Sequence, residues 1–83
     1  MYPNYYAYPA ILYYDPDGIS IEFPDLPGCL PCGQTTEEAF HNAKEALGVH
    51  LYGMEQDGEP IPAPTPLQGL HPEEGGVVTL VEV

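Results

Sequence analysis

The chain contains no arginine, no tryptophan and a single lysine, against thirteen acidic residues, so its formal net charge is −12. Proteins that bind nucleic acid directly displace counterions from phosphates with lysine and arginine. We therefore expect no direct contact with nucleic acid. The same negative field would attract a basic partner and speed its encounter, although a charge of this kind also keeps a small protein in solution.

Long apolar runs and export signals are also missing. No stretch approaches the roughly 20 apolar residues that cross a membrane, and the N-terminus lacks the basic start and cleavage site of an export signal. Two cysteines placed so close together cannot close a long loop, which fits a reducing compartment. We expect a cytoplasmic protein of one domain over 1–83, without a membrane, whose small core would gain stability from self-association.

The first part of the chain alternates apolar runs with turn residues. The run AYPAILYY over 7–14 is followed by D-P-D-G at 15–18, which fits a type I turn. Apolar and polar residues then alternate over 19–23, the period of a strand with one buried face. Prolines and a glycine break the pairing next, so a third strand is predicted to be short, over 29–32, with Pro31 favouring the sheet edge.

A helix is predicted over 36–56. Thr35 and Glu38 form a capping box, and Glu37 and Glu38 both favour the positive end of the helix dipole. At about 100° per residue, the apolar residues form one narrow stripe against the sheet. The predicted core, from the helix and the second strand, is Ile19, Ile21, Phe23, Phe40, Ala43, Leu47, Leu51 and Met54.

The end of the chain predicts an extended segment and a last strand. Residues 59–76 are too rich in proline and glycine for regular structure and predict a flexible connection. The run VVTLVEV at 77–83 is typical of a strand. The order predicts an α+β fold, β-β-β-α-β, in which three antiparallel strands, one helix and a fourth strand form two layers.

The C-L-P-C run at 29–32 raises the question of redox or metal chemistry. A redox C-x-x-C pair opens a helix, whose dipole lowers the pKa of a thiol, but here the helix begins later and the neighbours are acidic. Structural zinc needs four ligands, and the three histidines show no ligand spacing. Glu37, Glu38, His41 and Glu45 share a helix face that suits a divalent ion, although a solvated helix start is the commoner explanation.

Two groups of exposed residues remain as candidates for contact with a partner or an ion. Carboxylates from the hairpin and the loop after it can hold Mg²⁺, which leaves a small metal-dependent nuclease as an alternative. No nucleophile–base pair or glycine-rich phosphate loop accompanies them, and we expect no cofactor. Val49 and Tyr52 fall on the outer helix face, as scattered surface residues or as a contact with another chain.

A longer pattern spans the middle of the chain: FPDLPGC, a glycine, and then T-x-E-E-A-x-x-N-A-x-E-A-L. It resembles the N-terminal domain of the HicB-like antitoxin family, and the resemblance extends over about 8–83. The matching positions are Phe23 to Cys29, Gly33, Thr35 or Thr36, Glu37, Glu38, Ala39, Asn42, Ala43, Glu45, Ala46 and Leu47. The resemblance implies a partial ribonuclease H-like fold with the same order of elements.

The resemblance also implies a role in binding and neutralising a HicA-like toxin, a small basic ribonuclease that cleaves messenger RNA with a histidine. Many relatives continue into a DNA-binding domain, whereas this chain ends at Val83, so we expect no C-terminal DNA-binding domain. The family carries a cysteine at the first position of C-L-P-C more often than at the second. Cys29 is therefore expected to pack as a small hydrophobe.

The sequence thus predicts a non-enzymatic, homodimeric antitoxin that masks a basic ribonuclease toxin with acidic side chains of the hairpin and the helix start. The alternatives are the metal-dependent nuclease and an orphan relative without a toxin. The candidate toxin-binding residues are Asp15, Asp17, Glu22, Asp25, Glu37 and Glu38, with Val49 and Tyr52 for an apolar contact.

Overall fold

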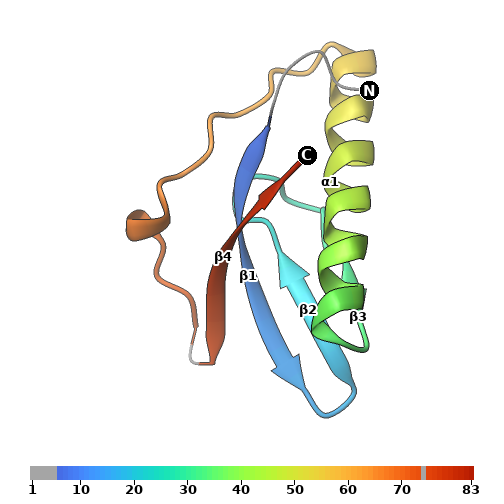
Figure 1. Ribbon diagram of the computed structural model, residues 1–83. Coiled ribbons are helices and arrows are strands. Elements are labelled where there is room, and N and C mark those ends of the chain that lie inside the picture. The colour runs from blue at the N-terminus through green and yellow to red at the C-terminus, as the bar shows by residue number, and fades with distance from the viewer. Residues whose placement is uncertain (1–5, 74) are drawn as a thin grey trace.

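The computed structural model describes residues 6–73 and 75–83, in which one long helix crosses one face of a four-stranded sheet (Figure 1). The elements are β1 (Ala7–Asp15), β2 (Gly18–Glu22), β3 (Cys32–Gly33), α1 (Thr36–Asp57), the 3-10 turn η1 (Leu67–Gly69) and β4 (Gly76–Glu82). The strands lie in the order β3-β2-β1-β4, and all neighbours are antiparallel. The predicted α+β fold and its order of elements are confirmed.

A tight hairpin joins β1 and β2. Asp15 pairs with Gly18 across the two residues of the turn. Gly18 has a φ of +146°, and a Cβ atom there would lie 3.0 Å from the carbonyl oxygen of Gly33. Glycine is therefore required at this position, both for the backbone angle and for the close approach of β3.

Pro9 lies inside β1, where a proline normally interrupts a sheet. The residues of a strand direct their backbone groups alternately to its two neighbours. Tyr6 exchanges hydrogen bonds with Val83 on the β4 side, so Pro9 faces the β2 side. The pairing with β2 ends at Ile11 and Glu22, and no hydrogen bond is lost because β2 does not extend to Pro9.

The third strand is shorter than predicted and begins later. The sequence predicts a strand over 29–32, whereas β3 contains only Cys32 and Gly33. The N–H of Cys29 donates to the carbonyl oxygen of Leu26 at 3.1 Å, which keeps this residue in a turn. The carbonyl oxygen of Pro31 accepts the first cross-strand hydrogen bond, from Ile21 at 2.9 Å. The predicted start was wrong because the preceding loop turns back on itself.

The helix ends are set by local hydrogen bonds. The hydroxyl oxygen of Thr35 accepts from the N–H of Glu38 at 3.1 Å, and the Glu38 carboxylate accepts from the N–H of Gln34 at 2.7 Å. At the other end, Gly58 adopts a left-handed conformation with φ +70°. The predicted N-cap at Thr35 is confirmed, and Glu38 reaches back as predicted but to Gln34, one residue before the cap. The predicted end of the helix differs by one residue.

The core lies between α1 and the sheet. Its buried residues are Tyr8, Ala10, Leu12, Ile19, Ile21, Phe23, Leu26, Cys29, Ala39, Ala43, Leu47, Leu51 and Val81. Phe40 and Met54, which the sequence places in the core, are only partly buried at its margin. The buried stripe begins at Ala39 instead, because a small side chain lets the first helical turn lie close to the strands. Val49 and Tyr52 lie on the outer face as predicted.

The proline-rich connection between α1 and β4 follows one side of the molecule (Figure 1) and is hydrogen-bonded to the rest of the domain at Pro62 and Thr65. The hydroxyl of Tyr8 donates to the carbonyl oxygen of Pro62. Asp25 accepts from the N–H of Thr65 at 2.9 Å and from its hydroxyl at 2.6 Å. The prediction of no regular structure here was wrong at η1, a single turn closed by the N–H of Leu70.

Burial raises the pKa of the Tyr8 hydroxyl, and Tyr6 and Asp25 nearby raise it further. The side chain therefore stays neutral and available as a hydrogen-bond donor over a wider pH range than a tyrosine in water. Within the described residues, no helix is long and apolar enough to span a membrane.

Candidate functional site

Two of the predicted carboxylates lie at the hairpin end of the sheet. Asp15 ends β1 and Asp17 follows in the turn, and both are exposed. Together with Gly18, Cys32 and Gln34 they line an open hollow of about 420 Å³. The Gln34 side chain donates to the carbonyl oxygen of Asp17 at 3.2 Å, so the turn is held against β3.

A second hollow, of about 510 Å³, lies between the loop after β2 and the C-terminal half of α1. We call it the acidic groove. Its residues are Asp25, Leu26, Pro27, Val49, His50, Gly53, Met54, Asp57 and Glu59. It combines three carboxylates with apolar side chains, among which Val49 is 72% exposed. The groove brings together two of the predicted residues, Asp25 and Val49.

Asp57 and Glu59 line the acidic groove but were not predicted. The last turn of α1 carries no basic residue, although the negative end of a helix dipole disfavours nearby carboxylates by about 0.3–1 kcal/mol each. Glu55 in the same turn accepts from the hydroxyl of Tyr6 at 3.1 Å. Acidic residues at a helix C-terminus, where the helix dipole disfavours them, are the sequence signal that points to this end of α1.

The other predicted residues lie outside both hollows. Glu22 is exposed at the end of β2, and Glu37 is exposed in the first turn of α1. Glu38 is engaged in the capping box, and Tyr52 is 57% exposed on the outer helix face. The eight candidates therefore form no single surface.

The hairpin carboxylates proposed for Mg²⁺ are spread along the sheet. Asp15 and Asp17 precede β2, whereas Asp25 follows its far end and is bonded to Thr65. Across residues 6–73 and 75–83, no three histidine, cysteine or acidic side chains are grouped closely enough to hold a metal ion. The geometry offers no support for the nuclease alternative.

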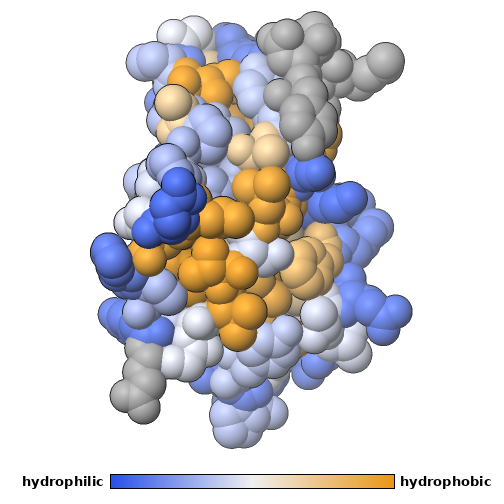
Figure 2. All heavy atoms as spheres, turned by 60° about the vertical axis from the view of Figure 1, so that its left-hand side comes forward, coloured by the Kyte–Doolittle hydropathy of each residue, from blue (hydrophilic) through white to orange (hydrophobic). Residues whose placement is uncertain are grey.

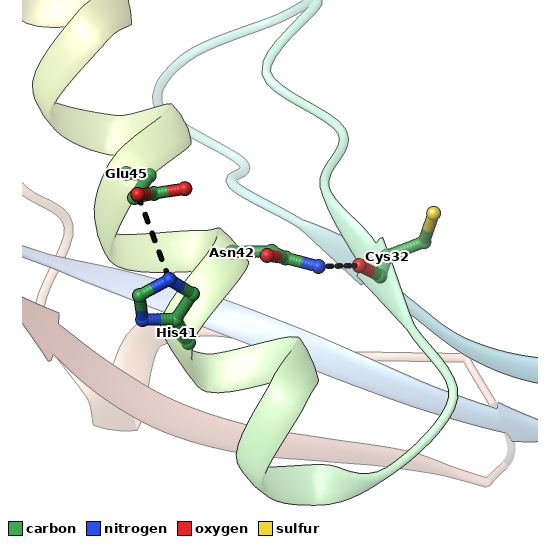
Figure 3. A network of polar contacts seen from close by, with 4 residues as sticks. All are labelled: Cys32, His41, Asn42 and Glu45. Carbon is green, nitrogen blue, oxygen red and sulfur yellow. Dashed lines mark hydrogen bonds and ion pairs between the residues drawn. The ribbon is translucent and has the colours of Figure 1, made fainter.

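The helix face predicted to suit a divalent ion holds an exposed pair instead. Nε2 of His41 lies 3.5 Å from Oε2 of Glu45, and the two side chains are 71% and 68% exposed. This is the one ion pair found in the described part of the chain. Asn42 points the other way and donates from Nδ2 to the carbonyl oxygen of Cys32 at 2.8 Å (Figure 3). Asn42 thus ties α1 to β3.

The two cysteines occupy different environments, and both are free thiols. Cys29 is buried in the core, and burial raises the pKa of its thiol. Cys32 is exposed, and its sulfur points away from α1 (Figure 3). The prediction that Cys29 packs as a small hydrophobe is confirmed.

We expect one fast-reacting and one slow-reacting thiol when the folded protein is treated with an aromatic disulfide reagent at pH 8. Cys32 should react within the first phase because it is exposed, whereas Cys29 should react only as the chain opens. Cys32→Ser should remove the fast phase, and 6 M guanidinium should make both thiols react at once. A fast phase that persists in Cys32→Ser would contradict this assignment.

The sequence matches a known protein family over most of its length. A family model described as the HicB_like antitoxin of bacterial toxin-antitoxin system matches residues 8–83. The chain belongs to this HicB-like antitoxin family. It is 39% identical over 61 residues to the antitoxin HicB of Escherichia coli K12, which covers 72% of this chain and 44% of that protein.

Solved structures agree in fold. The N-terminal domain of the Burkholderia pseudomallei antitoxin HicB superposes with a TM-score of 0.82 at 28% identity, covering 94% of this chain and 98% of that one. A chain of the HicA3 and HicB3 toxin-antitoxin complex superposes with a TM-score of 0.76 at 28% identity, covering 90% and 94%. Two curated relatives are longer, and this chain spans 59% and 44% of their length.

Proposed function

We propose that this HicB-like chain is a non-catalytic antitoxin, which binds a small basic ribonuclease of the HicA type and masks its RNA-binding and catalytic surface. Its similarity to a chain of the HicA3 and HicB3 toxin-antitoxin complex supports this assignment. The observation that carries it is the unneutralised charge: thirteen acidic residues face one lysine, and the described residues form a single ion pair. A surface built to hold RNA phosphates is complementary to such a field.

The acidic groove is the surface that suits this role. A lysine or arginine side chain of the toxin can lay its aliphatic stem against Val49 and Met54 and place its charge among the carboxylates. Both oxygens of Asp25 already accept from Thr65, which fixes the direction of the carboxylate. Each oxygen retains a second lone pair for an incoming donor. The hairpin and helix-start carboxylates would then steer the encounter from outside the contact.

Neutralising the groove should weaken toxin binding without weakening the fold. In Asp57→Asn with Glu59→Gln, we expect the dissociation constant for the toxin to rise at least about tenfold, which corresponds to about 1.4 kcal/mol. The melting temperature should stay the same or rise, because an acidic residue leaves the negative end of the helix dipole. Binding is measured by calorimetry with a purified basic ribonuclease of the HicA type.

A matched variant distinguishes the loss of the groove from the loss of net negative charge. Glu22→Gln with Glu37→Gln also removes two negative charges, but outside the groove. It should change the dissociation constant much less. If this pair has the larger effect, the groove is the wrong surface although the function stands. Co-purification at low salt and at 0.5 M salt, followed by an RNA cleavage assay, tests the function itself: absence of a complex at both salts would overturn it.

A further inference from the structure

Within residues 6–73 and 75–83, no strand pairs with the outer edge of β4. β4 is the last strand of the sheet and pairs with β1 alone. Its sequence, GVVTLVE, is almost entirely β-branched or apolar, contains no lysine or proline, and carries one charge at its end. Edge strands normally carry such interruptions because an unguarded edge is a template for another strand. An edge seven residues long without them is suited to pairing.

The hydrogen-bond register shows which groups are available at this edge. Val83 exchanges both backbone hydrogen bonds with Tyr6, at 3.4 and 2.9 Å. Because bonding alternates along an antiparallel strand, the odd-numbered residues of β4 bond to β1. Val78, Leu80 and Glu82 therefore direct their N–H and C=O groups outward. Their side chains lie on the sheet face away from α1, since Val81 points into the core.

Apolar side chains lie beside this edge. Leu80 is 45% exposed and Leu67 of η1 is 41% exposed, while Val78 and Leu70 are half-buried. Figure 2, which looks toward this side of the molecule, shows hydrophobic side chains gathered at its middle. A partner that binds this edge has to offer matching backbone hydrogen bonds and apolar side chains, because charge attraction contributes little there. A basic RNA-binding surface does not fit these requirements.

We propose that β4 pairs with β4 of a second copy of this chain, antiparallel, with Thr79 opposite Thr79 of the partner subunit. In this register Val78 lies opposite Leu80 of the partner subunit, and Glu82 lies opposite Gly76 of the partner subunit. All seven residues are paired, and no carboxylate faces another. Moving the two-fold axis to Leu80 would leave the end of the strand unpaired and place Val78 opposite the partner's Glu82. The strand is thus self-complementary about Thr79.

The dimer joins two four-stranded sheets into one continuous sheet. Neither β4 nor η1 contributes to the acidic groove, which is formed by α1 and the loop after β2. Each copy therefore keeps its groove open to the toxin. This inference does not depend on the proposed function, because it concerns the chain without the toxin.

The first test is the mass in solution by sedimentation equilibrium. We expect the wild-type chain, of 9.1 kDa, to sediment at twice that mass at tens of micromolar. Leu80→Lys should sediment as a monomer, because it places a charge in the centre of the contact. Leu30→Lys is the matched control: Leu30 is 68% exposed in the loop before β3, and the variant should remain a dimer. A monomeric wild-type chain, or a dimer unchanged by Leu80→Lys, would overturn the proposal.

Salt separates this contact from toxin binding. Each copy carries a net charge of −12, so raising the salt from 0.05 to 0.5 M should tighten the dimer by screening repulsion. The same change should loosen the complex with a basic toxin. A dimer that dissociates as salt rises would show that charges, and not this edge, hold it together.

Amide hydrogen exchange tests the register residue by residue. In the wild-type dimer the amides of Val78 and Leu80 should be protected along with those of Thr79 and Val81. In Leu80→Lys the amides at 78 and 80 should exchange rapidly, while those at 79 and 81 stay protected by β1. Rapid exchange at 78 and 80 in the wild-type chain, with protection only after toxin is added, would assign the edge to the toxin instead and overturn the dimer.

Discussion

Replacing Gly33 with alanine is expected to destabilise the chain by about 3 kcal/mol, a large part of the 5–15 kcal/mol that stabilises a typical native domain. A Cβ atom at Gly33 would lie 2.6 Å from the nitrogen and 2.7 Å from the Cα of Ala39, and 3.0 Å from the carbonyl carbon of Glu38. All three atoms belong to the backbone of the first turn of α1. Relief requires the whole helix to move away from the sheet, because a backbone atom cannot rotate aside as a side chain does.

Urea unfolding followed by circular dichroism measures this loss, and Gly53→Ala is the matched control. Gly53 lies inside α1, and a Cβ atom there would meet nothing within 4 Å. The same added methyl group should therefore stabilise the chain by about 0.5–1 kcal/mol through helix propensity. If Gly33→Ala unfolds at the wild-type urea concentration, β3 does not approach α1 as closely as this structure has it.

Gly33 illustrates what the sequence predicts and what it leaves open. The motif resemblance marks the position, yet the reason for a glycine appears only where β3 meets the first turn of α1. Elements defined by local pattern were predictable: the hairpin follows from D-P-D-G and the alternation after it, and the start of α1 from the Thr35–Glu38 capping box. These signals lie within a few residues of one another, so no tertiary contact is needed to read them.

Features that depend on distant contacts were missed. The acidic groove joins Asp25 to Asp57, which are far apart in the chain and meet because the loop after β2 packs beside α1. The start of β3 depends on the turn that returns through Leu26. Ala39 is buried and Phe40 only partly so, because of how closely the helix approaches the sheet. Helical periodicity alone does not determine that distance.

Phe23→Ala is expected to cost about 3–5 kcal/mol, a large part of the 5–15 kcal/mol that stabilises a typical native domain. Phe23 follows β2, is 1% exposed and lies in the core cluster. Truncation leaves a cavity among the buried core side chains, which relax only partly around it. Phe40 was predicted to be equally central but is only partly buried, so Phe40→Ala should cost clearly less.

The two truncations remove the same side chain, so the difference between their urea midpoints reports burial. Phe23 also begins the loop that carries Asp25 into the acidic groove. Below its unfolding transition, Phe23→Ala should therefore bind the toxin more weakly than Phe40→Ala, in addition to unfolding at lower urea. Equal midpoints would show that both rings share the core as the helical stripe predicts. Unequal midpoints with equal toxin binding would show that the loop keeps its shape without the ring, and that Thr65 alone orients Asp25.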